Sequence, residues 1–367
     1  MKIVQVIPMF GLAGAETMCE NLTMELHREG HHVVVVSLYD YHSFITDRLE
    51  KEGIKIYYVG KKRGLDLSII GKLMSVFSSI KPDVVHSHLY SLKYVTIAAA
   101  LTGIKGRIHT MHNIATKETT PKNQKLNYFF FHYMHVVPVS LSREIQETVE
   151  TRYKLNNKQT PVIYNGIDLS KCIVKENYEN REELNYLHIG RFSSQKNHKL
   201  LIKAFEKVKR TIPEAVLTLV GAGEEEAEIK QLVSSLHLQD SVHFIGLQDN
   251  VYPILNQADV FVLSSTYEGM PMTIIEAMGT GLPVVSTNVG GISSMIEDHK
   301  EGLLTDVNEK SFANAMIQMR DVKQRRLMGI KGREKANKYF SVETMTKHYV
   351  DLYSSRINPK RRTKRLK

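Results

Sequence analysis

The chain has 367 residues, of which 42% are hydrophobic and 24% are charged, a composition typical of a soluble globular protein. A chain of this length can bury enough apolar surface for two domains. No apolar run reaches the roughly 20 residues that a membrane-spanning helix needs. Its first residues, MKIVQVIPMF, predict a strand and not a secretion signal. Two cysteines, Cys19 and Cys172, provide neither a disulfide framework nor a metal-ligand spacing, so we expect a cytoplasmic protein.

Strand-like runs alternate with helical patterns along the chain, which predicts parallel sheets covered by helices on both faces. Twelve strands suit two Rossmann-like units better than one oversized sheet. The predicted fold class is therefore α/β, with two Rossmann-like parallel-sheet domains facing each other across a cleft. The predicted strands are residues 2–8, 32–38, 54–60, 83–89, 106–112 and 135–141, followed by residues 185–192, 215–223, 241–247, 259–265, 282–288 and 302–305.

A glycine-rich loop, PMFGLAGAETM, follows the first predicted strand. Gly11 and Gly14 permit a tight turn that brings the backbone close to a ligand, and residues 15–28 then have helical character. The spacing matches neither the dinucleotide-binding fingerprint nor the P-loop. Because open α/β sheets bind ligands at the carboxyl ends of their strands, we expect Gly14 to lie near a bound ligand.

Three histidines lie on or just after predicted strands of the first half. His86 and His88 share one strand face in DVVHSHL, which would suit a metal ion, but no third ligand stands at a convincing spacing. A packed, hydrogen-bonded role is the favoured interpretation of this pair. His112 ends the fifth strand, where a neutral imidazole can hydrogen-bond a sugar hydroxyl or a developing charge.

Residues 160–185 combine an Asn-Gly turn with a charged, weakly periodic stretch, so they are the predicted linker. The segment GRFSSQKNHKLLIKAF follows the first strand of the second half and places Arg191 and Lys196 in a loop. Fixed cations at the carboxyl end of a strand can stabilise a diphosphate leaving group. Arg grips phosphate bidentately, whereas Lys is a compact point charge.

The segment SSTYEGMPMTIIEAMGTGLPVV keeps two carboxylates, Glu268 and Glu276, in an apolar stretch. A buried carboxylate costs several kcal/mol unless something donates hydrogen bonds to it, and we expect a ligand to be that donor. For either glutamate alone, a surface position is the favoured alternative. Both together favour a ligand whose ribose hydroxyls reach Glu276 while Glu268 contacts its other end.

Between the two glutamates, a loop is predicted to lead into a helix that begins at Pro271 and runs through Met278. The free amides of a first helical turn bind phosphate, and Gly269 leaves room for its approach. Gly269, Met270 and Pro271 are accordingly predicted donor-binding residues. No Asp-x-Asp occurs in the chain, so we expect a reaction without a metal ion or other cofactor.

These residues resemble the family 4 retaining glycosyltransferases of the GT-B fold. The likeness covers nearly the whole chain, through the segments GLAGAE, NGID, GRFSSQKNH, VGAGEEE and FIGLQDNV and the two glutamates with seven residues between them. It implies that Glu268 contacts the donor sugar near the reacting centre and that Glu276 binds the ribose. Arg191 and Lys196 match the family's diphosphate-binding pair, and His112 aligns with a histidine that borders the transferred sugar.

The resemblance also implies a domain plan. Residues 1–164 would bind the acceptor, residues 165–340 the nucleotide sugar, and a last helix at about 341–356 would return to the first domain. Many bacterial relatives build capsule, exopolysaccharide or lipopolysaccharide on lipid-linked acceptors at the inner membrane face. A basic amphipathic helix within residues 61–81 would suit that location. A core-packed crossover helix is an equally open interpretation of that segment.

The C-terminus concentrates the formal net charge of +10. A tail of residues 357–367 would suit an anionic inner-membrane surface, with each basic residue contributing about 1 kcal/mol near anionic lipid. A solvated terminus is the open alternative, and no nucleic-acid partner is expected. The tail holds six basic residues: Lys360, Arg361, Arg362, Lys364, Arg365 and Lys367.

The predicted activity is transfer of a sugar from a nucleotide diphosphate donor, expected to be uridine-linked, to a hydroxyl of a glycan or lipid-linked glycan, with the anomeric configuration retained. The departing diphosphate would accept the acceptor's proton, while Arg191, Lys196 and the helix dipole stabilise it. Two other classes stay open. A nucleotide-sugar epimerase of the same architecture would act on the donor alone, and a non-catalytic nucleotide-binding protein would bind it without turnover.

Overall fold

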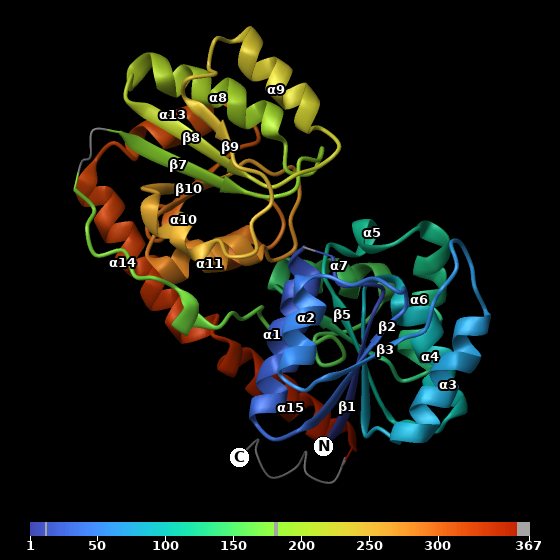
Figure 1. Cartoon of the computed structure of the whole chain (residues 1–367). Helices are drawn as coiled ribbons and strands as arrows, with labels where there is room; N and C mark the ends of the chain where they lie inside the picture. The colour runs from blue at the N-terminus through green and yellow to red at the C-terminus, as the bar shows by residue number, and fades with distance from the viewer. Residues whose placement is uncertain (12, 180–182, 358–367) are drawn as a thin grey trace. The chain divides into compact units, whose positions relative to one another are not determined.

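The computed structural model of the chain describes residues 1–11, 13–179 and 183–357. They form two compact units, each built on its own sheet (Figure 1). Unit 1 consists of Met1–Gly166 and the chain from Val342 onward, and unit 2 consists of Ile167–Ser341. The division therefore falls inside the predicted linker, at Gly166, and the last helix belongs to the unit in which the chain begins.

Unit 1 contains a six-stranded parallel sheet in the order β3-β2-β1-β4-β5-β6. The strands alternate with helices, and Val and Ile dominate β1 and β2, as a parallel sheet covered on both faces requires, whereas β4 and β5 also carry buried histidines. The strands are β1 (Lys2–Ile7), β2 (His32–Ser37), β3 (Lys55–Tyr58), β4 (Val84–His88), β5 (Gly106–Met111) and β6 (Val137–Ser140).

Helices cover both faces of this sheet. In Figure 1, α1 and α15 run side by side on one side of the sheet, while α3 and α4 lie on the other. The helices of unit 1 are α1 (Gly14–Arg28), α2 (Phe44–Lys51), α3 (Ser68–Ile80), α4 (Leu92–Leu101), α5 (Ala115–Glu118), α6 (Pro121–Tyr133), α7 (Arg143–Tyr153) and α15 (Val342–Ile357), with a short 3-10 turn η1 (Leu89–Ser91).

Unit 2 repeats the plan with a second parallel sheet in the order β12-β11-β10-β7-β8-β9. In Figure 1, α8, α9 and α13 lie on one side of this sheet and α10 and α11 on the other. The strands are β7 (Leu184–Ile189), β8 (Ala215–Val220), β9 (Val242–Phe244), β10 (Val260–Leu263), β11 (Val284–Thr287) and β12 (Gly302–Thr305).

The helices of unit 2 begin at side-chain caps in several places. Asn197 caps α8, Asn308 caps α13 and Asp321 caps α14, each accepting a hydrogen bond from a first-turn amide. The helices are α8 (His198–Thr211), α9 (Glu226–Ser235), α10 (Tyr252–Gln257), α11 (Met272–Thr280), α12 (Ile292–Met295), α13 (Glu309–Gln318) and α14 (Val322–Tyr339), with a 3-10 turn η2 (Leu169–Lys171).

The two six-stranded parallel sheets confirm the predicted fold class of two Rossmann-like domains, and each of the twelve predicted segments contains a strand. In both sheets the first strand of the unit lies at the centre and the order reverses beside it. Such a switch point brings the loops of two neighbouring strands together at the carboxyl edge, where ligands of open α/β sheets bind.

The segment of residues 61–81 does not form the single basic amphipathic helix considered above. Only α3 is helical, and its apolar side chains Ile69, Leu73 and Phe77 are buried in the core of unit 1. Lys61 is itself buried, and its ammonium donates hydrogen bonds to the carbonyls of Lys62 and Gly64 at 2.8 and 2.6 Å. The structure therefore supports the core-packed crossover.

Within the described part of the chain, no helix has the length and apolar character needed to cross a bilayer. The predicted basic tail lies outside the described residues from residue 358 onward.

Candidate functional site

Two loops at the carboxyl edge of the unit 2 sheet hold most of the predicted site residues. β7 and β10 are neighbours in this sheet, so the loop after β7 lies against the loop after β10. The amide of Thr266 donates a hydrogen bond to the carbonyl of Gln195 at 2.8 Å, and the Ser264 hydroxyl donates to the carbonyl of Lys196 at 2.9 Å. These contacts fix the two loops relative to each other.

Glu268 is buried and finds its partners inside the protein. Its carboxylate lies 2.7 Å from the Lys196 ammonium and accepts a hydrogen bond from the Ser265 hydroxyl at 2.5 Å. The two charged side chains are only 17% and 6% exposed. The expectation that a ligand must satisfy this carboxylate is therefore wrong for Glu268, because an ion pair and a hydroxyl already do so.

Glu276 differs from Glu268 in this respect. It lies on α11, about 9% exposed, and no described residue donates a hydrogen bond or an ion pair to its carboxylate. Burial raises the pKa of Glu276 to about 7. One turn earlier on the same helix, the buried hydroxyl of Thr273 has no partner among the described residues. Residues three apart share a helix face, so this face of α11 carries two polar groups whose hydrogen-bonding capacity is unused.

The segment between Glu268 and α11 is buried throughout, including Gly269, Met270 and Pro271. Pro271 is the N-cap residue, and the helix begins at Met272, one residue later than predicted. The loop packs against Gly290, which lies in the segment after β11. Gly290 has φ +55°, and a Cβ at this position would lie 1.9 Å from the carbonyl oxygen of Glu268.

Arg191 follows β7 but does not join Lys196 in a common cation site. Its side chain is 73% exposed and forms an ion pair with Glu224 at 2.9 Å. Glu224 follows β8, the other neighbour of β7. A hydrogen bond from its own backbone amide and a smaller contribution from Arg191 lower the pKa of Glu224. Arg191 and Lys196, predicted as a diphosphate-binding pair, therefore each form an ion pair with a different glutamate.

The loop after β7 and the loop after β8 are in close backbone contact, and this contact fixes the position of the Arg191 backbone. The Phe192 amide donates a hydrogen bond to the Ala222 carbonyl at 3.2 Å. A Cβ at Gly223 would lie 2.3 Å from the Phe192 carbonyl oxygen, and one at Gly221 would lie 2.1 Å from the Gly190 carbonyl oxygen. Only glycine permits this approach.

His112 and Gly14 belong to unit 1. His112 directly follows β5 and is half-buried, and its Nε2 lies 3.1 Å from Nδ1 of His88. Burial, with a smaller contribution from His109, lowers the pKa of His112 to about 3, so the ring is neutral at physiological pH. Gly14 is exposed and is the first residue of α1.

The paired histidines of β4 have the hydrogen-bonded role that the sequence favoured. Both ring nitrogens of His86 are bonded, to the hydroxyls of Tyr353 and Thr110 at 2.7 Å each, and both of His88 are bonded as well. Among residues 1–11, 13–179 and 183–357, no three His, Cys, Asp or Glu side chains are grouped to hold a metal ion.

Two further acidic side chains near these edges, Glu16 and Glu118, were not among the predicted site residues. Glu16 on α1 is buried, and burial raises its pKa. Glu118 on α5 follows His112 closely, and burial raises its pKa to about 7 against the opposing effect of the His112 and Asn113 amides. Its place in the first turn of the helix that follows the glycine-rich loop was a usable signal for Glu16, whereas nothing local distinguishes Glu118.

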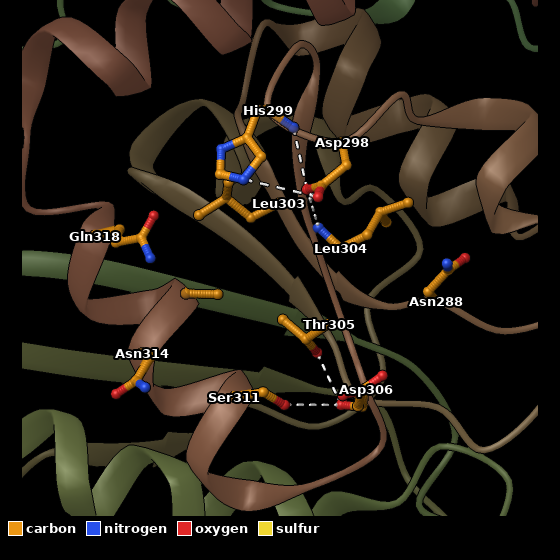
Figure 2. Close-up of a pocket in the computed structure, with 11 residues that line it drawn as sticks. Asn288, Asp298, His299, Leu303, Leu304, Thr305, Asp306, Ser311, Asn314 and Gln318 are labelled. Atoms are coloured by element: carbon orange, nitrogen blue, oxygen red, sulfur yellow. Dashed lines mark hydrogen bonds and ion pairs between the residues drawn. The ribbon is translucent and has the colours of Figure 1, made fainter.

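A surface hollow of about 390 Å³ in unit 2 contains none of the predicted site residues (Figure 2). It lies beside β12 and α13, and its polar lining includes Asp298, whose carboxylate accepts hydrogen bonds from the amides of His299 and Leu304. These groups satisfy one another, so the hollow does not compete with the carboxyl edge as the candidate site.

Comparison with known proteins relates both units to sugar-transferring enzymes. A family model described as Glycosyltransferase Family 4 matches residues 12–171, and one described as Glycosyl transferases group 1 matches residues 172–335. The chain is 29% identical over 306 residues to an Escherichia coli UDP-Gal:alpha-D-GlcNAc-diphosphoundecaprenol alpha-1,3-galactosyltransferase, covering 78% of this chain and 79% of that protein. It is 28% identical to the N-acetyl-alpha-D-glucosaminyl L-malate synthase of Bacillus anthracis, covering 94% and 93%.

Solved structures show the same fold. The crystal structure of Anabaena HepE in complex with UDP and glucose superposes with a TM-score of 0.85 at 20% identity, covering 97% of this chain and 100% of that one. A glycosyltransferase from Rickettsia africae superposes with a TM-score of 0.82 at 18% identity, covering 97% and 98%.

Proposed function

The chain belongs to the family 4 glycosyltransferases, and we propose that it transfers a sugar from a uridine diphosphate donor to a hydroxyl of a glycan or lipid-linked glycan, with retention of the anomeric configuration. The observation that carries the proposal is the pair of unused polar groups on α11, the Glu276 carboxylate and the Thr273 hydroxyl. A vicinal diol, such as that of a ribose, would donate the hydrogen bonds that no described residue donates to this carboxylate.

The donor's nucleotide is assigned to unit 2. Its diphosphate would meet the amides at the start of α11, which carry the partial positive charge of a helix N-terminus. Uridine is proposed as the base because HepE binds UDP and the Escherichia coli relative uses UDP-Gal. The acceptor is assigned to unit 1, and its class follows from two relatives that act on diphosphoundecaprenol-linked sugars.

Lys196 is assigned to the developing charge on the diphosphate. Its ammonium forms an ion pair with Glu268 at 2.7 Å, and a donor phosphate would take over this contact. The leaving diphosphate would accept the acceptor's proton on the face where the new bond forms, and the lysine would stabilise it without a metal ion. Catalysis at the inner face of a membrane, as in capsule or exopolysaccharide synthesis, is part of the same proposal.

The identity of the donor is tested by thermal shift. A bound donor raises the melting temperature in proportion to the logarithm of its concentration over its Kd. We expect UDP and at least one UDP-sugar to stabilise the protein, and GDP at equal concentration to do so less. Incubation of the donor alone, followed by analysis for an epimer, separates transfer from epimerisation, and an epimer formed without acceptor would contradict the proposal.

Turnover tests the role of Lys196. We expect Lys196→Ala to lower kcat by about 10² or more, the range found when one group that stabilises a developing oxyanion is removed. Lys199→Ala is the matched control, because Lys199 is about half-exposed and pairs with Glu228 on the surface. Nearly normal turnover in Lys196→Ala, measured as UDP release, would remove Lys196 from the mechanism.

A further inference from the structure

The histidines of β4 connect the interior of unit 1 to His112. His88 is fully buried, and each of its ring nitrogens has one partner. Nε2 lies 2.9 Å from Oε1 of Gln5 on β1, and Nδ1 lies 3.1 Å from Nε2 of His112. Gln5 is also fully buried, so the chain Gln5–His88–His112 runs from the centre of the sheet to its carboxyl edge.

The partners of His88 determine which nitrogens carry protons. In the orientation that the structure gives the Gln5 amide, its oxygen faces His88 and only accepts, so Nε2 of His88 carries the proton and its Nδ1 carries a lone pair. Nδ1 of His88 therefore accepts a hydrogen bond that Nε2–H of His112 donates. The remaining nitrogen, Nδ1 of His112, is then an acceptor, and it has no hydrogen bond to any residue that the structure describes.

The histidine rings carry no charge that would change this arrangement of protons. His86, His88, His109 and His112 are all held neutral, since burial is the largest cause that lowers the pKa of each. The remaining titratable group close to the His112 backbone is Glu118. Because the rings are neutral, His88 determines which nitrogen of His112 carries the proton and does not change the charge of His112.

A second set of hydrogen bonds holds the neighbouring His86 ring, against which His88 packs. The His86 and His88 rings pack with centroids 4.2 Å apart. His86 is bonded to Tyr353 of α15 and to Thr110, whose hydroxyl lies 2.9 Å from that of Tyr349, also on α15. Tyr349 and Tyr353 of the last helix therefore hold His86 in place, and His86 packs against His88.

We propose that His88 is a positioning residue for the transfer reaction: it fixes the ring and the tautomer of His112, so that Nδ1 of His112 accepts a hydrogen bond from a hydroxyl of the sugar substrate. This inference rests on the proposed function and names a residue outside the predicted site. It assigns the His-Ser-His segment of β4 to the reaction and not to a metal ion.

Two substitutions of His88 separate its two nitrogens. Asparagine places an amide where Nδ1 was, and its oxygen can still accept from His112. Glutamine instead reaches the position of Nε2, so it retains the contact with Gln5 and leaves His112 without an acceptor. We expect kcat for UDP release from UDP-glucose or UDP-galactose to fall at least tenfold in His88→Gln and less than threefold in His88→Asn, with KM for the donor little changed in both.

Stability is the control for a merely structural role. Each variant loses one of the two hydrogen bonds, so both should lower the melting temperature by similar amounts. Equal kcat in the two variants, or a loss of kcat that follows the loss of stability, would overturn the proposal.

The tautomer is tested without any substrate. In 15N-histidine-labelled protein we expect His112 to carry its proton on Nε2 in the wild type and in His88→Asn, and a mixture of tautomers in His88→Gln. A wild-type proton on Nδ1 would overturn the inference even if sugar transfer is confirmed. Conversely, normal turnover in His112→Ala would refute the proposed role of His112 while leaving the tautomer measurement intact.

Discussion

Glu268 and Glu276 are both buried, yet they differ in what satisfies them. Lys196 and Ser265 neutralise and hydrogen-bond Glu268, whereas no described residue does so for Glu276. Burial without a hydrogen-bond donor destabilises the charged form of a carboxylate. The raised pKa of Glu276, about 7, is the direct consequence. Unfavourable burial of this kind concentrates at binding sites, because the ligand later supplies the missing hydrogen bonds.

Glu276→Gln should therefore stabilise the unliganded protein at high pH. The folded-state pKa of about 7 lies above the ordinary value of 4.5, so the folded protein binds the proton more tightly and stability falls as pH rises between these values. Above pH 7 the cost approaches about 3 kcal/mol, from 1.36 kcal/mol per pKa unit, and glutamine avoids it. Urea unfolding at pH 5 and pH 8 measures the difference, and UDP affinity should fall in the variant.

Glu268→Gln is the control for this prediction, since the same substitution there breaks a buried ion pair and should destabilise the protein at both pH values. If Glu276→Gln lowered stability at pH 8 as Glu268→Gln does, Glu276 would have a partner within the protein and its assignment to the ribose would fail.

At the scale of elements, the site depends on loops that are fixed by backbone contacts. The Glu268 loop touches the segment after β11, and the Arg191 loop touches the segment after β8, both at positions where only a glycine fits. In each case a glycine after a strand allows a neighbouring backbone to approach closely, and this contact restricts the loop to one conformation. The functional side chains are therefore positioned by residues that make no contact with a substrate themselves.

Gly290→Ala tests this positioning. The added Cβ would overlap the Glu268 carbonyl oxygen at 1.9 Å, and φ +55° is itself strained for alanine. We expect the donor-induced rise in melting temperature to be lost, and stability to fall by several times the cost of the strain alone. Gly246→Ala is matched in unit and in backbone, with φ +70° and no atom within 4 Å, so it should cost about 1 kcal/mol. Equal losses in both variants would show that the contact with Glu268 is unimportant.

At the scale of the whole molecule, the alternation of strand and helix patterns was enough to predict both sheets. Strand order was not readable, and the site depends on it. Lys196 reaches Glu268 because β7 and β10 are neighbours, and Arg191 reaches Glu224 because β8 lies on the other side of β7. The pairing of His88 with His112 likewise requires β4 beside β5. Local patterns predict which residues lie at the carboxyl edge, whereas the partners of each residue are set by contacts between distant segments.

The net positive charge of the chain is concentrated in its C-terminal residues. Removal of residues 358–367 lowers the formal charge from +10 to +4, because six basic residues are lost, and leaves α15 complete. If the tail binds anionic lipid, sedimentation with phosphatidylglycerol vesicles at low salt should weaken at least tenfold, since each basic residue contributes about 1 kcal/mol near such a surface.

A full-length variant with all six basic residues changed to Gln should behave as the truncation does, and UDP binding should be unchanged in both. Vesicle binding that survives both changes would place the membrane contact on the folded units. The exposed apolar side chains Leu126, Phe129 and Tyr133 of α6 would then be the next surface to alter.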